Sequence, residues 1–348
     1  MTEGAAVAPV GDVKIGLFLT NQHPVGADLV VGMDDQLRMV RAVRDRGWDS
    51  IWAGQHYLPD GMAMPQCVPF VSRITAECGS MEVGIGILLL ALHNPLDVAE
   101  TWASVDVLCG GRLTFGVGLG YREVEYHGFG LDPKSKVRRF EANLDLVKRL
   151  WTTDNVDSDL EWCRLESVTL NIKPVQKPRP PIWIAANAHA AVERAARMGD
   201  AWMINPHATT DTITEQAALF RATRESEGLP PATTTPAMRE IYCAPTRALA
   251  VERAAPYLLK KYRHYADWGQ HKALPGDEDF RAGFDELSRG RFIVGTPDDC
   301  LERLLPWRDE LGVDHFIFRT DWVGMPADTA LQSIDLLDRE VVPVLRAT

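Results

Sequence analysis

The chain has 348 residues, of which 46% are hydrophobic and 24% charged, a balance that indicates a folded, enzyme-sized protein and excludes a collagen-like, disordered or disulfide-rich chain. Its 37 Lys and Arg against 48 Asp and Glu give a net charge of −11, which argues against nonspecific binding to nucleic acid or to anionic membranes. The longest nearly apolar run, residues 84–92, is much shorter than the roughly 20 residues that a membrane-spanning helix needs.

Residues 1–12 contain neither a basic patch nor a long apolar stretch, so they do not resemble a secretory signal. We expect them to form a disordered lead-in to a single domain over residues 13–348. The 6 cysteines are far apart and no pair forms C-x-x-C, which argues against a disulfide framework or a cysteine zinc site. Reduced thiols and a cytoplasmic location are therefore expected.

Short apolar runs alternate with amphipathic stretches along the whole chain. The apolar runs predict eight strands, over residues 13–19, 50–55, 83–90, 113–117, 182–186, 201–205, 239–243 and 313–319. Stretches with helical spacing follow most of them, at residues 37–43, 68–78, 96–109, 137–151, 190–198, 211–227 and 331–341. Another helix begins at Thr296, which is a good N-cap followed by Pro297 and two acids.

Two segments interrupt this alternation. Residues 152–180 alternate apolar with polar side chains, which predicts an inserted hairpin. Residues 246–292 are less regular and rich in aromatic side chains. This second insertion is either a lid above an apolar substrate or a set of surface helices with an aromatic core.

Eight strands that alternate with helices favour an α/β fold of the closed (β/α)8 TIM-barrel type, with insertions. A doubly wound open sheet is the alternative. In a barrel, the carboxyl ends of the strands carry the chemistry.

The predicted strand ends are rich in amides and imidazoles and poor in carboxylates. Glu123, Glu125 and Asp321 are the only acids near them, which disfavours a glycosidase, an enzyme that needs two facing carboxyl groups. Neither His-x-His nor His-Glu-x-x-His occurs, so no metal site is expected, and the Gly-x-Ser-x-Gly motif of serine hydrolases is also missing. The pattern favours a site that holds a polar cofactor with neutral hydrogen-bonding groups.

Single features have two interpretations each. The glycines of residues 116–120 either contact a phosphate or allow close packing, and His56 either serves the reaction or is a structural histidine. The basic residues Lys134, Lys136, Arg138 and Arg139 are typical of a solvated helix entry.

Four ordered segments, residues 84–95, 108–122, 173–187 and 195–202, together resemble the luciferase-like flavin-dependent monooxygenase superfamily, the LLM class of flavin-dependent oxidoreductases. This resemblance implies a (β/α)8 barrel that binds FMN or the deazaflavin F420 at the strand carboxyl ends, often as a homodimer. It implies a non-prolyl cis peptide between Gly86 and Ile87, behind the flavin ring, and places His56 near the reactive flavin edge as the catalytic residue.

The resemblance also supplies candidate cofactor-binding residues. Gln55 and Asn94 would hydrogen-bond the flavin edge. The cofactor phosphate would lie between two further segments, and its expected neighbours are Gly118, Gly120, Tyr121, Arg122, Asn187, Ala188 and His189. Some relatives have an arginine where this chain has Leu119, so Arg122 or backbone amides would have to replace it.

The function that these features imply is an FMN-dependent monooxygenase. Reduced FMN from a separate reductase would react with O2 to oxygenate a small, apolar organic substrate. One alternative is an F420-dependent oxidoreductase that transfers hydride without oxygen, and another is a non-catalytic flavin-binding barrel.

Overall fold

The computed structural model describes residues 12–276 and 279–347, so most of the expected lead-in, residues 1–11, lies outside the described part of the chain. Its main feature is a parallel sheet of nine strands in the order β10-β9-β6-β5-β3-β1-β13-β11-β12. A parallel bridge between Ile204, just after β10, and Ala237 of β11 joins the two flanks of the sheet. Eight strands thus form a closed barrel. The ninth strand, β12, pairs with the carboxyl-terminal end of β11, residues 241–243. The fold is therefore the predicted TIM-barrel type, and the alternative prediction of a doubly wound open sheet is wrong.

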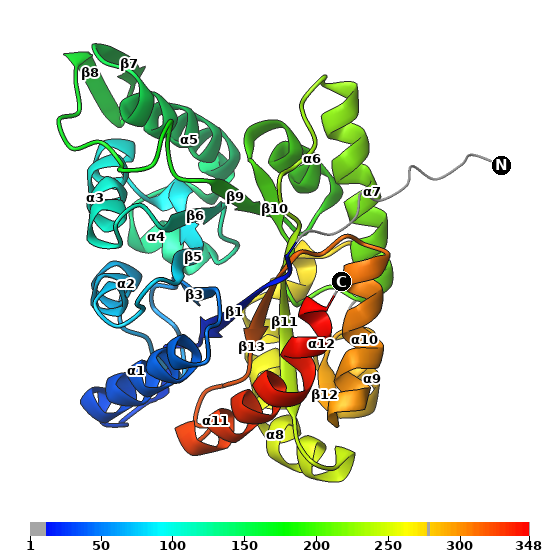
Figure 1. Ribbon diagram of the computed structural model, residues 1–348. Helices are drawn as coiled ribbons and strands as arrows, with labels where there is room; N and C mark the ends of the chain where they lie inside the picture. The colour runs from blue at the N-terminus through cyan, green and yellow to red at the C-terminus, as the bar shows by residue number, and fades with distance from the viewer. Residues whose placement is uncertain (1–11, 277–278, 348) are drawn as a thin grey trace.

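The strands of the barrel and its appendages have the following bounds. They are β1 (Lys14–Leu19), β3 (Ser50–Ala53), β5 (Glu82–Leu89), β6 (Leu113–Gly118), β9 (Ile182–Ala185), β10 (Ala201–Met203), β11 (Pro236–Cys243), β12 (Ile293–Gly295) and β13 (His315–Arg319). Two antiparallel pairs lie outside the barrel: β2 (His23–Pro24) with β4 (Met62–Ala63), and β7 (Val156–Leu160) with β8 (Cys163–Val168). The pair β7–β8 confirms the predicted hairpin and lies beyond α5 at the upper left of Figure 1.

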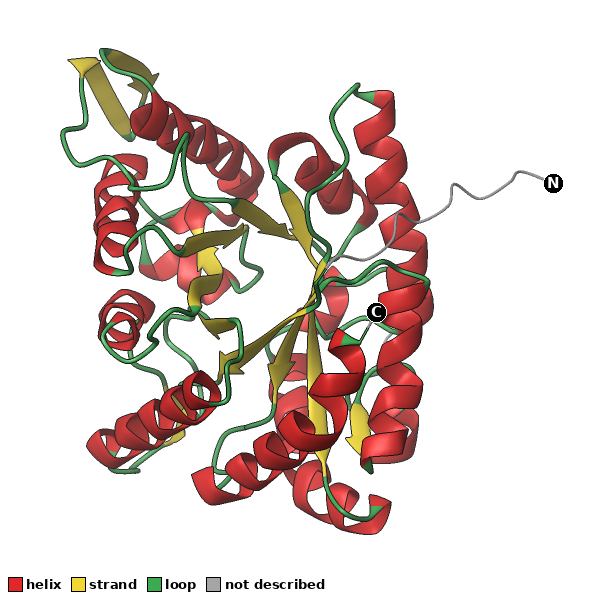
Figure 2. Cartoon of the chain, in the orientation of Figure 1, coloured by secondary structure: helices red, strands yellow, loops and turns green. Residues whose placement is uncertain are grey.

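Helices surround the strands on the outside (Figure 2). They are α1 (Leu29–Asp45), α2 (Cys67–Thr75), α3 (Pro95–Leu108), α4 (Glu123–Gly128), α5 (Lys136–Thr152), α6 (His189–Met198), α7 (Thr210–Ser226), α8 (Arg247–Asp267), α9 (Phe284–Ser288), α10 (Pro297–Asp309), α11 (Ala327–Leu336) and α12 (Val342–Arg346). Short 3₁₀ turns occur at Leu90–Leu92, Pro133–Ser135 and Gln270–Ala273, and one π turn at Leu337–Val341.

The insertion at residues 246–292 is more regular than its sequence suggests. It contains α8, a helix of 21 residues, followed by the turn at Gln270–Ala273 and by α9. Tyr262 of α8 packs edge-on against Phe280 and Phe292, so the segment has an aromatic core of its own. The sequence of α8 shows little helical periodicity because apolar side chains lie on more than one of its faces. It also contains Pro256, a residue that is unusual inside a helix, although α8 continues through it.

Side chains fill the half of the barrel that lies toward the amino ends of the strands. Trp52 and Trp183 stack there with ring centroids 4.9 Å apart, and His315 lies edge-on to Trp183. Ser50 Oγ accepts a hydrogen bond from Trp52 Nε1 at 2.8 Å and lies 2.7 Å from His315 Nε2. A second cavity, of about 570 Å³, lies at the amino ends of the strands and is lined by Lys14, Glu82 and His315 among others, whereas barrels of this type place their chemistry at the carboxyl ends.

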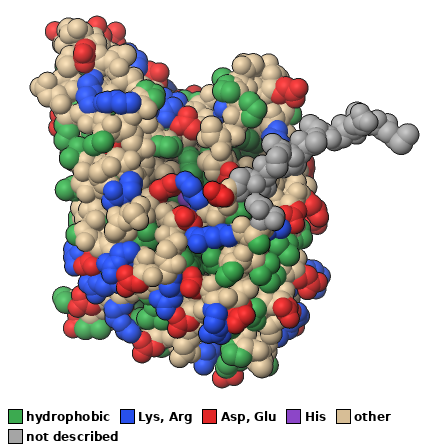
Figure 3. Space-filling model, in the orientation of Figure 1, with side chains coloured by type: hydrophobic (Ala, Val, Ile, Leu, Met, Phe, Trp, Pro, Cys, Tyr) green, Lys and Arg blue, Asp and Glu red, His purple; other side chains and the backbone are tan. Residues whose placement is uncertain are grey.

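The surface carries charged side chains of both signs. On the face in Figure 3, acidic and basic side chains are interspersed, without a large area of one sign. Among residues 12–276 and 279–347, no helix combines the length and apolar character that crossing a bilayer requires.

Candidate active site

A cavity of about 360 Å³ opens at the carboxyl ends of the barrel strands. Side chains and backbone from β1, β3, β5, β6, β9, β10, β11 and β13 or the loops after them contribute to its lining, together with Tyr265 of α8. Two cationic side chains, Lys136 and Arg319, line it, and within the described residues its lining contains no Asp or Glu. The cavity therefore suits a ligand with negative charge.

The floor of the cavity is shaped by a change of register in β5. The pairing of β5 with β6 shifts between Ile85 and Leu88, and the peptide between Gly86 and Ile87 is cis, as predicted. A Cβ atom on Gly86 would lie 2.6 Å from the Met203 side chain, so glycine is needed for this close packing, and Gly86, Ile87 and Met203 give the cavity an apolar floor without a projecting side chain at residue 86. Such a surface is suited to the face of a planar ring.

One end of the cavity is lined by backbone from two segments and by one cation. Gly118 ends β6, Gly120 and Tyr121 follow it, and Asn187 and Ala188 precede α6. Lys136, the first residue of α5, lines the same cavity and has no ion pair within the described residues. Amides before a helix together with an ammonium group form a typical phosphate site.

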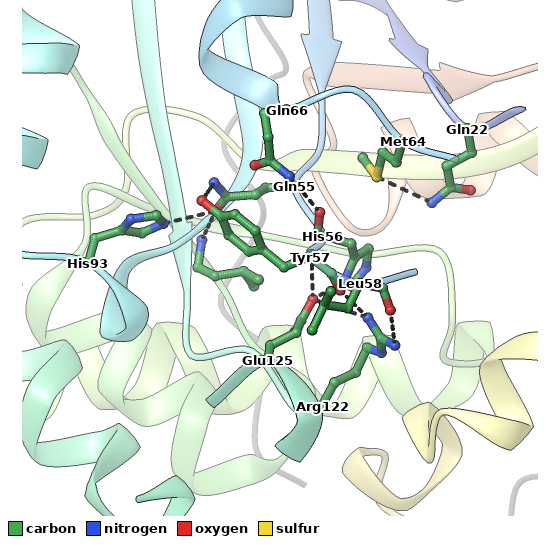
Figure 4. Close-up of polar contacts among 11 residues, drawn as sticks. Gln22, Gln55, His56, Tyr57, Leu58, Met64, Gln66, His93, Arg122 and Glu125 are labelled. Atoms are coloured by element: carbon green, nitrogen blue, oxygen red, sulfur yellow. Dashed lines mark hydrogen bonds and ion pairs between the residues drawn. The ribbon is translucent and has the colours of Figure 1, made fainter. Parts of the chain in front are cut away.

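His56 lines the cavity and is held from behind by a buried carboxylate (Figure 4). Its Nδ1 lies 3.0 Å from Oε1 of Glu125, whose side chain is fully buried. The same oxygen accepts hydrogen bonds from the backbone N–H of Tyr57 at 2.9 Å and from Arg122 Nη1 at 3.3 Å. A proton on Nδ1 directed to Glu125 leaves Nε2 free to exchange a proton with a ligand.

Gln55 connects two strand ends beside the cavity. Its Oε1 accepts a hydrogen bond from the Leu89 N–H at 3.0 Å, and its Nε2 donates to the Tyr57 hydroxyl at 3.0 Å. His93 Nε2 lies 3.3 Å from the same Oε1, and burial lowers the pKa of His93 to about 4. A neutral His93 can donate to Gln55, which completes an uncharged network at this side of the site.

Potential metal ligands do not cluster in the part of the chain that the structure describes, where no group of three His, Cys, Asp or Glu side chains could hold an ion. All six cysteines are buried as free thiols. The geometry thus provides a flat floor, a phosphate-like end and an imidazole, which together suit a flavin-type cofactor.

The family described as luciferase-like monooxygenase matches residues 13–315 of the chain. The chain belongs to this family. It is 23% identical over 310 residues to a 4-hydroxyprotoasukamycin monooxygenase of Streptomyces nodosus subsp. asukaensis, covering 86% of this chain and 83% of the relative. It is also 23% identical over 332 residues to an F420-dependent glucose-6-phosphate dehydrogenase of Amycolatopsis mediterranei, covering 91% and 96% of the two chains.

A solved structure shows the same fold. The oxygenating constituent of 3,6-diketocamphane monooxygenase from the CAM plasmid of Pseudomonas putida, in complex with FMN, superposes with a TM-score of 0.78 at 14% identity. The match covers 96% of this chain and 98% of that one. Luciferase-like proteins thus include FMN monooxygenases and F420-dependent dehydrogenases.

Most of the residues that the sequence assigned to the luciferase-like site line the cavity. They are Gln55, His56, Gly86, Ile87, Gly118, Gly120, Tyr121, Asn187 and Ala188. Three others do not line it: Arg122, Asn94 and His189.

The side chains of these three residues make contacts outside the cavity. Arg122 donates to the carbonyl oxygens of Tyr57 at 2.6 Å and Leu58 at 2.9 Å and stacks over Trp268, so its donors are engaged away from the cavity. Asn94 is the N-cap of α3 and accepts a hydrogen bond from Leu96 N–H. His189 faces outward, 3.6 Å from Glu215. Lys136, expected to be a solvated helix entry, lines the cavity instead.

Sequence reasoning also missed the wall opposite Lys136. Arg319, at the end of β13, lines it, and His207 after β10 and Gln270 in the turn after α8 are further polar residues of the cavity lining. Arg319 and His207 stand at predicted strand ends, which was the available signal. The lid interpretation of residues 246–292 placed this segment above the barrel, and Tyr265, Gln270 and Ala273 do line the cavity, but which side chains reach it depends on how α8 packs.

Proposed function

We propose that this protein is an FMN-dependent monooxygenase, which uses reduced FMN from a separate reductase and O2 to oxygenate an organic substrate. The observation that carries this proposal is the single free cation, Lys136, among the described residues at the phosphate-like end of the cavity. FMN supplies the oxygen chemistry when it is bound, and the protein supplies orientation, proton transfer and a water-poor pocket.

Charge at this end favours FMN over F420, which carries an acidic oligoglutamyl tail. Of the other basic residues nearby, Arg138 pairs with Glu161, buried Arg139 donates to the Ala91 carbonyl and stacks over Trp162, and Lys134 is exposed and does not line the cavity. One ammonium group and a helix N-terminus are sufficient for one phosphate. A long polyanion would find little further attraction on a chain of net charge −11.

The residues around the flat floor support oxygenation rather than storage of the cofactor. His56 is held at the cavity by Glu125, in an orientation suited to moving a proton to or from a ligand. Met203, Met238 and Phe18 line the cavity with apolar surface that excludes water. A storage protein would have no need of an oriented imidazole in this position.

Anaerobic titration of the purified protein with reduced FMN and, separately, with reduced F420 tests the proposal. We expect tighter binding of reduced FMN and product formation that stops when O2 is removed. Lys136→Gln should weaken FMN binding by about tenfold, because a charge-assisted contact to the phosphate is lost. The matched control, Arg138→Gln, removes a cation that does not line the cavity and should leave FMN binding unchanged. Tighter binding of F420, with turnover that is independent of O2, would instead show a hydride-transferring oxidoreductase.

A further inference from the structure

The wall of the cavity opposite the phosphate-like end contains a second cation, Arg319. In the ring β1-β3-β5-β6-β9-β10-β11-β13, strand β13 lies four strands from β6 in either direction. Arg319 ends β13, whereas the phosphate-like end follows β6 and β9. A cofactor phosphate at Lys136 therefore leaves Arg319 for another ligand.

Arg319 is 4% exposed, and it retains an unused donor. Nε donates to Thr20 Oγ1 at 3.1 Å, and Nη2 contacts Gln22 Oε1 at 3.4 Å. Within the described residues Nη1 has no hydrogen-bond partner, although the side chain lines the cavity. A buried guanidinium that is only partly hydrogen-bonded is costly unless a ligand completes it.

No carboxylate of the described chain forms an ion pair with Arg319. Asp321 lies two residues further on, but its side chain accepts hydrogen bonds from Thr20 and Gln36. Glu240, the other buried acid near this wall, is paired with Lys261 and accepts from Trp322. Asp321 attracts Arg319 electrostatically, with Thr20 between them, but forms no direct ion pair with it, so Nη1 remains available to a ligand in the cavity.

The same wall has a second unsatisfied polar group and an apolar neighbourhood. Gln270, 3% exposed, lines the cavity, and its Oε1 has no hydrogen-bond partner in the described chain. Met238 and Met64 also line the cavity, and the ring of Phe18 lies 5.4 Å from the guanidinium carbon of Arg319. Arg319 requires an accepting polar end on the ligand, whereas Gln270 Oε1 is itself an acceptor and requires a separate donor group; the rest of the ligand would be apolar.

We propose that Arg319, aligned by Thr20 and Gln22, binds an anionic oxygen of the substrate, either a carboxylate or an ionised phenol or enol. This inference rests on the proposed function for the identity of the reaction, and it replaces a purely apolar substrate by an apolar body with an acidic end. Arg319 acts as a specificity residue, and the planar guanidinium suits a two-oxygen acceptor.

Calorimetric titration with matched pairs of probes tests this, both with and without oxidised FMN bound. The pairs are naphthoate with methyl naphthoate, and para-nitrophenolate with para-nitroanisole. In at least one pair, the anion should bind about 10- to 100-fold more tightly than its neutral partner. The pair that shows the preference distinguishes a carboxylate substrate from a phenolate substrate.

Variants test whether the preference for the anionic probe depends on Arg319. Arg319→Gln should reduce it to about twofold or less, and Arg319→Lys should retain part of it. Lys136→Gln, at the opposite end, should keep the preference and so excludes binding of the probe in the phosphate position. If Arg319→Gln fails to fold, Gln22→Glu decides instead, because a carboxylate beside Arg319 competes with an anionic ligand and should abolish the preference.

Two results would overturn the inference: no preference for either anion in the native protein, or a preference that persists in Arg319→Gln or in Gln22→Glu. Failure of the proposed function is distinguishable, because calorimetry needs no turnover. A protein that does not bind FMN but shows an Arg319-dependent preference would retain the anion site and lose the monooxygenase assignment.

Discussion

At the scale of single residues, the main feature of the site is how one buried carboxylate orients His56. Glu125 is fully buried, and burial of a carboxylate is costly without hydrogen bonds, which here all converge on Oε1 and leave Oε2 without a partner among the described residues. Three donors meet at its Oε1: His56 Nδ1, the Tyr57 N–H and Arg122 Nη1. Arg122 thus serves the site indirectly, by neutralising the group that holds the imidazole.

His56→Ala should lower turnover with reduced FMN, O2 and an accepted substrate by about 10²- to 10⁴-fold, the usual contribution of a general acid–base. The free energy of unfolding should change little, because His56 lies at the rim of the cavity and Glu125 keeps two other donors. Steady-state kinetics and urea unfolding check the two parts. The control is His127→Ala on α4, an exposed histidine outside the cavity. Full activity in His56→Ala would remove His56 from the mechanism, and loss of folding would show a structural role.

At the scale of elements, the contact between β5 and β6 determines the floor of the site. A Cβ on Gly116 of β6 would lie 1.9 Å from the carbonyl oxygen of Ile85, which is backbone and cannot rotate away. Gly118 is similarly close to the Ile87 side chain. For Gly116, close packing is therefore the correct one of the two interpretations, whereas Gly118 and Gly120 also line the cavity.

Gly116→Ala should lower the free energy of unfolding by at least about 2 kcal/mol, since overpacking against backbone forces the strands apart. Gly283→Ala is the matched control, because nothing lies within 4 Å of a Cβ at that position. Urea unfolding of both variants measures the difference. Equal stability of the two variants would contradict the close approach of β5 and β6.

At the scale of the whole molecule, the fold buries several histidines in neutral form. Burial lowers the pKa of His315 to about 3 and of His93 to about 4, and lowers the pKa values of His23 and His207 as well. In the unfolded chain these groups titrate near pH 6.5. Below that pH the unfolded state binds more protons than the folded state, so stability falls as pH falls toward the folded pKa values.

The free energy of unfolding should therefore decrease between about pH 6.5 and about pH 4, by up to about 1.4 kcal/mol per pH unit for each such histidine. His315→Gln removes one of them and should reduce this slope by about that amount, whatever its effect on stability at neutral pH. Urea unfolding at a series of pH values measures the slope. His127→Gln, on the surface, should leave the slope as it is. An unchanged slope in His315→Gln would show that His315 is protonated in the folded protein.

The sequence by itself determined much of the local structure. The eight strands, the β7–β8 hairpin and the N-cap at Thr296 were predicted, and the structure confirms them. These features depend on residues within a few positions of one another, so periodicity and short motifs are sufficient to detect them. The cis peptide between Gly86 and Ile87, also confirmed, was predicted from the resemblance to the luciferase-like family. The cavity residues at strand ends followed from the same strands.

Tertiary structure alone decided which side chains the site uses. Arg122 turns to the carbonyl oxygen of Tyr57, 65 residues earlier in the chain, and so leaves the phosphate-like end to Lys136. Thr20 aligns Arg319 across 299 residues, and Gln270 reaches the cavity only because α8 packs over the barrel mouth. A hydrogen-bond donor has many partners within its reach, and only the closed barrel determines which of them lie beside it, because closure brings residues from distant parts of the chain into contact.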